Sequence, residues 1–492
     1  MASGESNTSK AIKGMSSQMV VTIALAVVEL VSFSIMSRLL SKADFGYYAA
    51  IAAVTAIFAS FSEAGIGAAV VQRKEMDRNY VDNAFTLSIL FGSFMAFLLV
   101  ALSSPLSKVI LKQEVLRVPL MLMAVTLLAN STASVSLGLL QRERKFLQIG
   151  AINLISLVVT TAVAVVLALK GYGFYAIVAK ALLTSLLTLF LSYLSVRRKF
   201  RFALDKDAFG SIFSFSGWLM VSVFFRNLSS YVDRLLLPRL LGIEATGLYN
   251  RPKEFINQAS SKIGGIYDTA LFPVLSGVQD ETASMQNAYR KSLYYLNLFA
   301  VTVCAGFVLN GDLLIRIFFG EKWVESVSAV FVIFSVALIF NFNARLLDCF
   351  FRSKGYTRQQ FRYRLLELAV KFGSLFIGYR WGVVGVAVSL TFTNFLLAAL
   401  KMGFISRKID IPVGESLSVV LSGYRPLLIY LPLVICLAVF PRTLAAELLM
   451  LAAYVALSVL MFLVCPSLVG GKYCNDAYPK AKSYIMKKLG GR

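Results

Sequence analysis

Several basic side chains stand inside long apolar stretches of this sequence, where a charge needs either a partner or water. Arg226, Lys180 and Lys262 have no acidic residue three or four positions away, the spacing at which a helix pairs charges locally. A guanidinium matches phosphate oxygens with two parallel hydrogen bonds, and an ammonium acts as a point charge. These three residues, together with Asn227 and Lys253, are therefore candidates for lining a hydrated cavity that binds a phosphorylated headgroup.

Four acidic residues fall within the predicted spans: Glu29, Glu63, Asp233 and Asp268. Burial favours the protonated form of a carboxyl group unless a cation lies close, so such a residue can take up a proton. Two interpretations stay open. The acids either couple transport to an ion, or form ion pairs with the embedded cations of neighbouring helices.

Two further pairs of charges are spaced to neutralise each other along one helix. Glu367 precedes Lys371 by four residues, and Arg345 precedes Asp348 by three. For these four residues a structural role is favoured over ligand binding.

A motif occurs twice, as "MSRLLSKADFGYYA" at 36–49 and "LPRLLGIEATGLYN" at 237–250. In each copy a glycine follows the arginine by eight residues and a tyrosine follows it by ten, and the copies are 201 residues apart. A weaker echo pairs "GYGFYAIVA" at 171–179 with "WGVVGVAV" at 381–388. The repeats indicate a duplicated unit. Arg38 and Arg239 are then either parts of a gate or duplicated structural anchors.

The composition places the chain in a membrane. It has 492 residues, of which 58% are hydrophobic and 15% charged, and its mean hydropathy is +0.73. Soluble domains average about 45–50% apolar and about 25% charged residues. The formal charge of +23 lies in short segments between apolar runs, which favours a topological role over nucleic-acid binding.

Cutting the chain at its polar interruptions predicts about fourteen transmembrane helices, each of roughly 20 residues. The basic loops predict that both termini are cytoplasmic. The expected domains are an N-terminal tail (1–16), two six-helix bundles (17–196 and 209–406), a cytoplasmic linker (197–208), two extra helices (425–465) and a basic tail (466–492). An even number of spans per repeat gives both bundles the same orientation.

The sequence resembles the multidrug/oligosaccharidyl-lipid/polysaccharide exporter superfamily, and within it the Wzx-type polysaccharide flippases, especially their colanic-acid branch. The resemblance is carried by "FG" at 45–46, "QRKE" at 72–75, "ALFPVLSGVQDE" at 270–281 and "FGEKW" at 319–323, in addition to the repeated motif. It implies an all-α polytopic fold in which two six-helix bundles form a V, with two peripheral C-terminal helices. The implied cargo is an undecaprenyl-pyrophosphate-linked oligosaccharide, flipped across the bacterial inner membrane by alternating access.

The same resemblance implies the lipid bilayer as a partner, together with a polysaccharide polymerase and chain-length machinery, and no nucleic acid. No metal or other cofactor is expected, because histidine is absent and the five cysteines lack paired metal spacing. The alternative function is a cation-coupled multidrug exporter of the same superfamily, whose cavity should present unpaired carboxylates. A membrane-bound enzyme is a weaker alternative, because the loops are short and no imidazole is present.

Overall fold

The computed structural model describes residues 7–62, 65–73, 77–279, 281–439 and 443–464, and every regular element in these ranges is helical. The described part holds ten helices long and apolar enough to cross a membrane, or eleven if the bent pair Val413–Gly423 and Pro426–Cys436 is one span. The chain is therefore an all-α, multi-pass membrane protein, as its sequence predicts. The larger number of fourteen spans stays a prediction.

The chain forms two compact units. Unit 1 comprises Met1–Asn250 and Phe318–Gly320, and unit 2 comprises Arg251–Ile317 and Glu321–Arg492. Unit 1 contains α1 (Asn7–Leu39), α2 (Lys42–Ser62), α3 (Ile66–Gln72), α4 (Arg78–Pro105), α5 (Arg117–Arg142), α6 (Phe146–Leu169), α7 (Tyr175–Val196), α8 (Lys206–Leu240) and the start of α9 (Ile243–Gly277). A π-helix η1 (Leu106–Ile110) and a short 3-10 helix η2 (Glu114–Leu116) connect α4 to α5.

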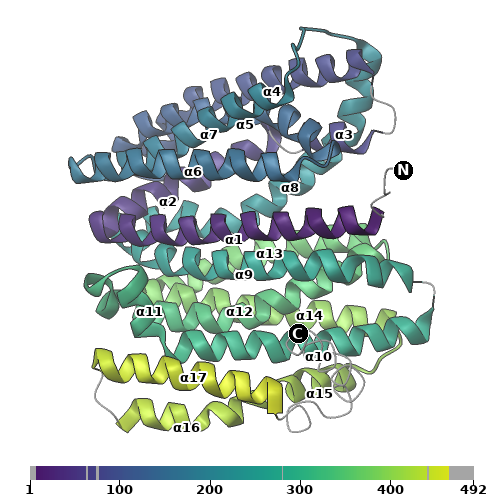
Figure 1. Ribbon diagram of the computed structural model, residues 1–492. Helices are drawn as coiled ribbons and strands as arrows, with labels where there is room; N and C mark the ends of the chain where they lie inside the picture. Colours follow the sequence, from purple (N-terminus) through teal and green to yellow (C-terminus); the bar gives the residue numbers. More distant parts are fainter. Residues whose placement is uncertain (1–6, 63–64, 74–76, 280, 440–442, 465–492) are drawn as a thin grey trace, which may run out of the picture. The chain divides into compact units, whose positions relative to one another are not determined.

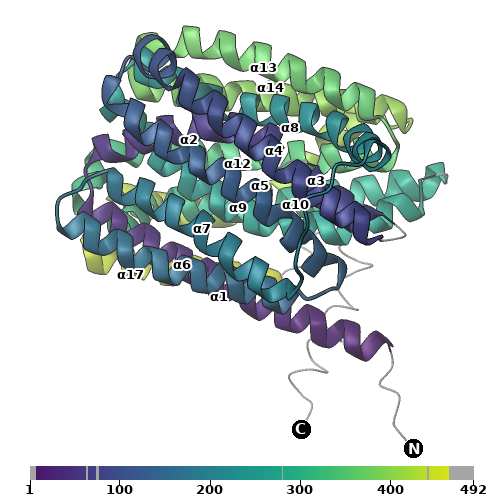
Figure 2. The same ribbon diagram turned by 90° about the horizontal axis from the view of Figure 1, so that it is seen from above.

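In unit 1, α5 packs between α4 and α7, α6 packs against α1 and α7, and α8 packs against α2. Figures 1 and 2 show α6 and α7 side by side. The Ser131 hydroxyl on α5 lies 2.7 Å from the carbonyl oxygens of both Ser62 on α2 and Ser88 on α4. Small residues that let helix backbones approach are a common means of packing in membranes, and hydroxyls serve as interhelical hydrogen bonders.

The two copies of the repeated motif meet through their glycines. A Cβ atom added to Gly46 would lie 1.9 Å from the carbonyl oxygen of Ile243, and one added to Gly247 would lie 1.9 Å from that of Lys42. In each case the carbonyl belongs to the residue four positions before the glycine of the other copy. The contact is therefore reciprocal. Only a residue without a side chain lets the starts of α2 and α9 approach this closely.

An aspartate anchors the first copy of the motif. The Asp44 carboxylate accepts hydrogen bonds from the backbone N–H and hydroxyl of Ser41, at 2.9 and 2.6 Å. It also accepts the N–H of Phe174, just before α7, at 2.8 Å. Asp44 thus caps its own helix and joins the starts of α2 and α7.

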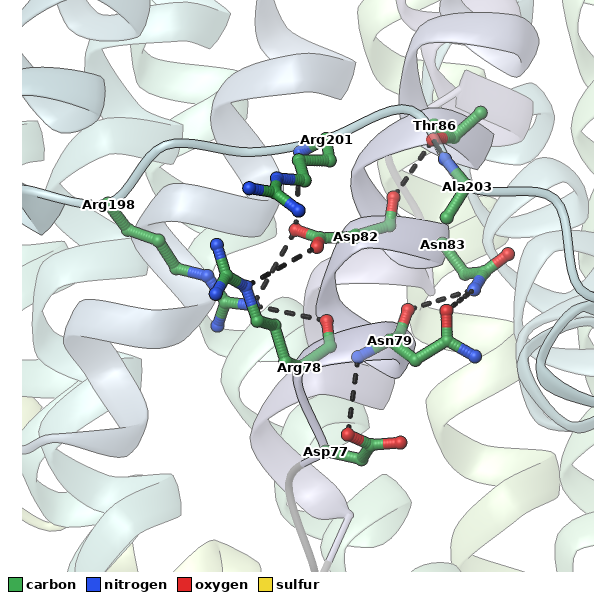
Figure 3. Close-up of polar contacts among 9 residues, drawn as sticks. All are labelled: Asp77, Arg78, Asn79, Asp82, Asn83, Thr86, Arg198, Arg201 and Ala203. Atoms are coloured by element: carbon green, nitrogen blue, oxygen red, sulfur yellow. Dashed lines mark hydrogen bonds and ion pairs between the residues drawn. The ribbon is translucent and has the colours of Figure 1, made fainter.

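The linker segment, residues 197–205, is fastened to α4 through three alternate backbone amides, those of Arg201, Ala203 and Asp205, and Figure 3 shows the first two. The N–H of Arg201 points at the Asp82 carboxylate at 3.4 Å, and that of Ala203 donates to the Thr86 hydroxyl at 3.0 Å. The N–H of Asp205 donates to the Asn83 side-chain oxygen at 2.7 Å. Residues 201–205 are therefore held as an extended strip along α4.

Unit 2 contains most of α9 and the helices α10 (Thr282–Leu309), α11 (Gly311–Phe318), α12 (Val324–Ser353), α13 (Thr357–Gly378), α14 (Gly382–Lys408), α15 (Val413–Gly423), α16 (Pro426–Val439) and α17 (Leu444–Val464), with η3 (Glu321–Trp323) and η4 (Tyr379–Trp381). The helix α12 packs against α10 and α14, and α10 also contacts α15, α16 and α17. Buried Asn297 on α10 and Asn343 on α12 exchange side-chain hydrogen bonds at 3.0 and 2.8 Å.

Replacing either motif glycine by alanine should destabilise the protein, because the new methyl group would collide with a backbone carbonyl. We expect Gly46→Ala and Gly247→Ala each to cost about 1–3 kcal/mol, the range for overpacking, measured as a lower thermal unfolding temperature in detergent. Because the contact is shared, the double variant should lose less than the sum of the single losses. Gly403→Ala is the matched control, since no atom lies within 4 Å of its added Cβ.

Removing the Asn83 side chain should loosen the linker segment, because the amide of Asp205 would lose its acceptor. One hydrogen bond is worth about 1 kcal/mol, so we expect tryptic cleavage within residues 197–206 to accelerate about fivefold in Asn83→Ala. The control Asn394→Ala removes an asparagine that bonds Asn341 in unit 2. An unchanged cleavage rate in Asn83→Ala would contradict this account of the linker.

Candidate functional site

The ammonium of Lys180 lies where three helices of unit 1 meet. Lys180 is half-buried on α7, and its Nζ donates to the hydroxyl of Ser32 on α1. Thr161 on α6 also donates to the Ser32 oxygen, at 3.2 Å. Both Ser32 and Thr161 are buried. Hydroxyl groups from α1 and α6 thus support a positive charge within an apolar bundle, a contact that the sequence does not predict because the partners are far apart in the chain.

Arg226 and Asn227 lie on different sides of α8. The Asn227 side chain donates to the carbonyl of Ala56 at 3.1 Å and to the hydroxyl of Ser60 at 2.9 Å, both on α2. Consecutive helical residues point about 100° apart. Arg226 is accordingly exposed, next to Ser230, whose hydroxyl donates to the Arg226 carbonyl at 2.8 Å. Asn227 fixes α8 against α2, and this fixes the direction in which Arg226 projects.

Asp233 lies at a buried contact between α8 and the second copy of the repeated motif. Its carboxylate accepts the hydroxyl hydrogen of Tyr249, the motif tyrosine, and the backbone N–H of Arg234. The guanidinium of Arg234 lies 5.0 Å from the centre of the Tyr231 ring. A hydroxyl and an amide thus stabilise the Asp233 carboxylate.

The remaining candidates of unit 1 occupy separate places. Glu29 is half-buried on α1, Arg38 is exposed at the end of α1, and Glu63 lies outside the described residues. Arg239 is exposed and donates to the Val109 carbonyl in η1 at 2.9 Å. That bond joins the end of α8 to the connection between α4 and α5.

Helix α9 carries three further candidates in unit 2. Lys253 is half-buried, and the side chains of Lys262 and Asp268 lie outside the described part. Arg251, which is buried, forms an ion pair with Glu254 at 3.5 Å. The helix therefore neutralises part of its own charge.

A group of charges that the sequence predicts only in part lies among α12, α13 and α14. Glu367 and Lys371 form the predicted ion pair at 2.7 Å. Asp348, expected to pair with Arg345, instead lies 2.9 Å from Lys401 and 3.6 Å from Arg364. Lys401 is buried, and no pattern in the sequence signals it, because its partner is 53 residues away.

The guanidinium of Arg345 lies against Gly264 of α9. A Cβ atom added to Gly264 on α9 would lie 1.7 Å from Arg345 Nη1, so the arginine crosses the helix where no side chain stands. This packing across a glycine explains why the local spacing to Asp348 is a poor guide to its partner.

Comparisons with known proteins agree with this architecture. The polysaccharide biosynthesis protein family matches residues 35–328. The chain is 23% identical over 482 residues to the teichuronic acid biosynthesis protein TuaB of Bacillus subtilis (strain 168), covering 95% of each. It is 21% identical over 398 residues to the lipopolysaccharide biosynthesis protein WzxC of Escherichia coli (strain K12), covering 80% of each.

A solved structure shares the fold. The lipid II flippase MurJ in an inward closed conformation superposes with a TM-score of 0.73 at 15% sequence identity, over 90% of this chain and 98% of that chain. The resemblance predicted from the short motifs is thereby confirmed. Because the family match covers more than half of the 492 residues, this chain belongs to the polysaccharide biosynthesis protein family.

Proposed function

We propose that this protein flips oligosaccharide repeat units linked to undecaprenyl pyrophosphate across the bacterial inner membrane by alternating access. Family membership and the fold shared with a lipid II flippase support a transporter of lipid-linked glycans. The observation that carries the proposal is the supported ammonium of Lys180. A cation held among apolar helices can attract an anionic headgroup that must cross the bilayer.

The proposed pathway is lined by Arg226, Lys180, Lys262, Asn227 and Lys253. Arg226 suits a pyrophosphate best, because its fork can donate two parallel hydrogen bonds to phosphate oxygens. Glu29, Glu63, Asp233 and Asp268 are the proposed acids for ion coupling or neutralisation, and Arg38 and Arg239 the proposed gate. The duplicated bundles, residues 17–196 and 209–406, would supply the two halves between which the headgroup moves.

The membrane orientation follows from charge. We propose that both termini and the linker segment lie in the cytoplasm, because the basic loops favour that side. A polysaccharide polymerase and chain-length machinery are the proposed partners that take over the repeat units after they have crossed.

A cation-exporting multidrug transporter is the rival function, and the state of the carboxylates argues against it. Such a cavity should offer carboxylates free to bind a cation. In the described part, Asp233 accepts from Tyr249, Glu254 pairs with Arg251, and Asp348 pairs with Lys401. Extrusion of cationic dyes that depends on Glu29 or Glu63 would reverse this preference.

Removing the charge of Lys180 should block transport. Lys180→Met keeps a long side chain but has no ammonium, and a hydrogen bond to a charged group is worth about 1.5–3 kcal/mol, so we expect flipping to fall roughly 10- to 100-fold. The measurement is the accumulation of lipid-linked repeat units on the cytoplasmic leaflet in cells that contain only the variant. Lys170→Gln, which removes an exposed lysine charge at the end of α6, is the control. Wild-type export in Lys180→Met at normal membrane abundance would refute the role of this lysine.

Arg226 should contribute to transport through both its positive charge and the bidentate geometry of its guanidinium group. We expect Arg226→Ala to cause a similar accumulation of substrate, and Arg226→Lys to restore only part of the rate, because an ammonium makes no bidentate contact. Lys170→Gln removes an exposed charge at the end of α6 and serves as the control. Equal thermal stability of the purified variants separates a lost contact from a lost fold. Full activity of Arg226→Ala would remove this residue from the pathway.

A further inference from the structure

The two most exposed large hydrophobic side chains of the described chain lie outside its spans. Phe202 is 76% exposed and Leu204 is 74% exposed, and both belong to the linker segment. The residues around them are polar and basic, so the sequence alone suggests an ordinary loop between two helices. An aromatic and an aliphatic side chain that the protein leaves about three quarters uncovered indicate an apolar medium or partner at that surface.

The fastening to α4 sorts the linker side chains onto two faces. Because the amides of residues 201, 203 and 205 are turned to α4, the backbone is extended there, and side chains of alternate residues point to opposite sides. Phe200 stacks on Phe85 of α4 with ring centres 4.4 Å apart, and Phe202 meets the same ring edge-on at 6.4 Å. Phe202 and Leu204 are two and four residues after Phe200, so their side chains lie on the same side of the extended backbone as that of Phe200.

The basic residues provide the complementary feature. Arg197, Lys199 and Arg201 are exposed, whereas Arg198 lies 3.5 Å from the Asp82 carboxylate and is neutralised there. Three exposed positive charges thus alternate with the apolar side chains within a few residues. This combination of basic and apolar groups is the one that binds an anionic membrane surface.

The position of the linker makes lipid its neighbour. Helix α7, which is apolar and long enough to span a membrane, ends at Val196, directly before the linker. Phe190 and Leu194 on its last turns are exposed, as expected for a lipid-facing surface, and Tyr193 contacts Phe200 with ring centres 5.8 Å apart. The lipid-facing surface of α7 therefore continues into the linker at the depth where the helix leaves the bilayer.

We propose that the linker segment is an interfacial anchor for an anionic leaflet. Phe202 and Leu204 insert at the boundary between headgroups and acyl chains. Arg197, Lys199 and Arg201 have the opposite parity and reach phospholipid phosphates through their long, flexible side chains. Because the linker leads directly into α8, the anchor sets the depth at which α8 and its Arg226 enter the membrane. This inference concerns the bulk leaflet and stands apart from the identity of the cargo.

Tryptophan fluorescence of the full chain tests the anchor. Phe202→Trp is reconstituted in phosphatidylcholine vesicles with and without one quarter phosphatidylglycerol, using phosphatidylcholine brominated near the headgroup end of its chains, and the wild-type signal is subtracted. We expect a blue-shifted emission and bromine quenching at least twofold stronger with phosphatidylglycerol. Adding Arg197→Gln, Lys199→Gln and Arg201→Gln should abolish that dependence on the anionic lipid.

Phe97→Trp is the matched control, because Phe97 on α4 is 70% exposed within a span and should be quenched equally in both lipids. Normal quenching of this control, combined with no quenching of the Phe202→Trp variant, overturns the proposal. The proposal is also overturned if quenching of the Phe202→Trp variant changes neither with phosphatidylglycerol nor with the triple substitution. If undecaprenyl pyrophosphate added to neutral vesicles reproduces the shift and phosphatidylglycerol does not, the segment binds the carrier lipid and the assignment to the leaflet is wrong.

Discussion

The reciprocal contact between the two copies of the repeated motif is the constraint on which the close approach of the starts of α2 and α9 depends. Each glycine lies against a backbone carbonyl of the other copy, one helical turn before the other glycine. The two glycine–carbonyl contacts therefore form at the same time, because neither can form without the other. In a membrane, where lipid gives helices little hydrophobic reason to associate, such backbone proximity supplies the packing energy that side-chain burial supplies in water. A duplicated sequence meets this requirement because each copy supplies the same glycine at the contact.

Polar groups in the bundles are held by partners on other helices. The hydroxyl of Ser131 reaches two carbonyls, Ser32 supports Lys180, and Tyr249 supports Asp233. Each such contact lowers the cost of a polar atom in the apolar interior and also fixes the rotation of its helix. The placement of Arg226 illustrates the consequence, because the bonds of Asn227 to α2 determine which side of α8 the arginine occupies. A contact between two helices can thus set the geometry of a residue that is proposed to bind the headgroup.

The sequence predicts those features that depend on neighbours along the chain. The apolar runs predict the helices, the spacing of four predicts the Glu367–Lys371 pair, and the repeated motif predicts a duplication. Contacts between distant segments leave no such pattern. Asp348 takes Lys401 from another helix in place of the nearby Arg345, and the linker is held by α4 residues more than one hundred positions earlier. The apolar surroundings of Lys180 mark it as a candidate, but its support by Ser32 is visible only in the fold.

The repeats also show which part of a duplicated motif must stay the same and which part is free to differ. The glycine contact needs a glycine in both copies, because a side chain on either one would separate both helices. The polar contacts carry no such mutual requirement. In the first copy Asp44 joins α2 to α7, but the second copy has Ala245 at the corresponding position and instead uses Tyr249 to bind Asp233. The shared backbone contact therefore keeps the two copies of the motif alike at one point, while the polar groups around it differ with the elements that each copy contacts.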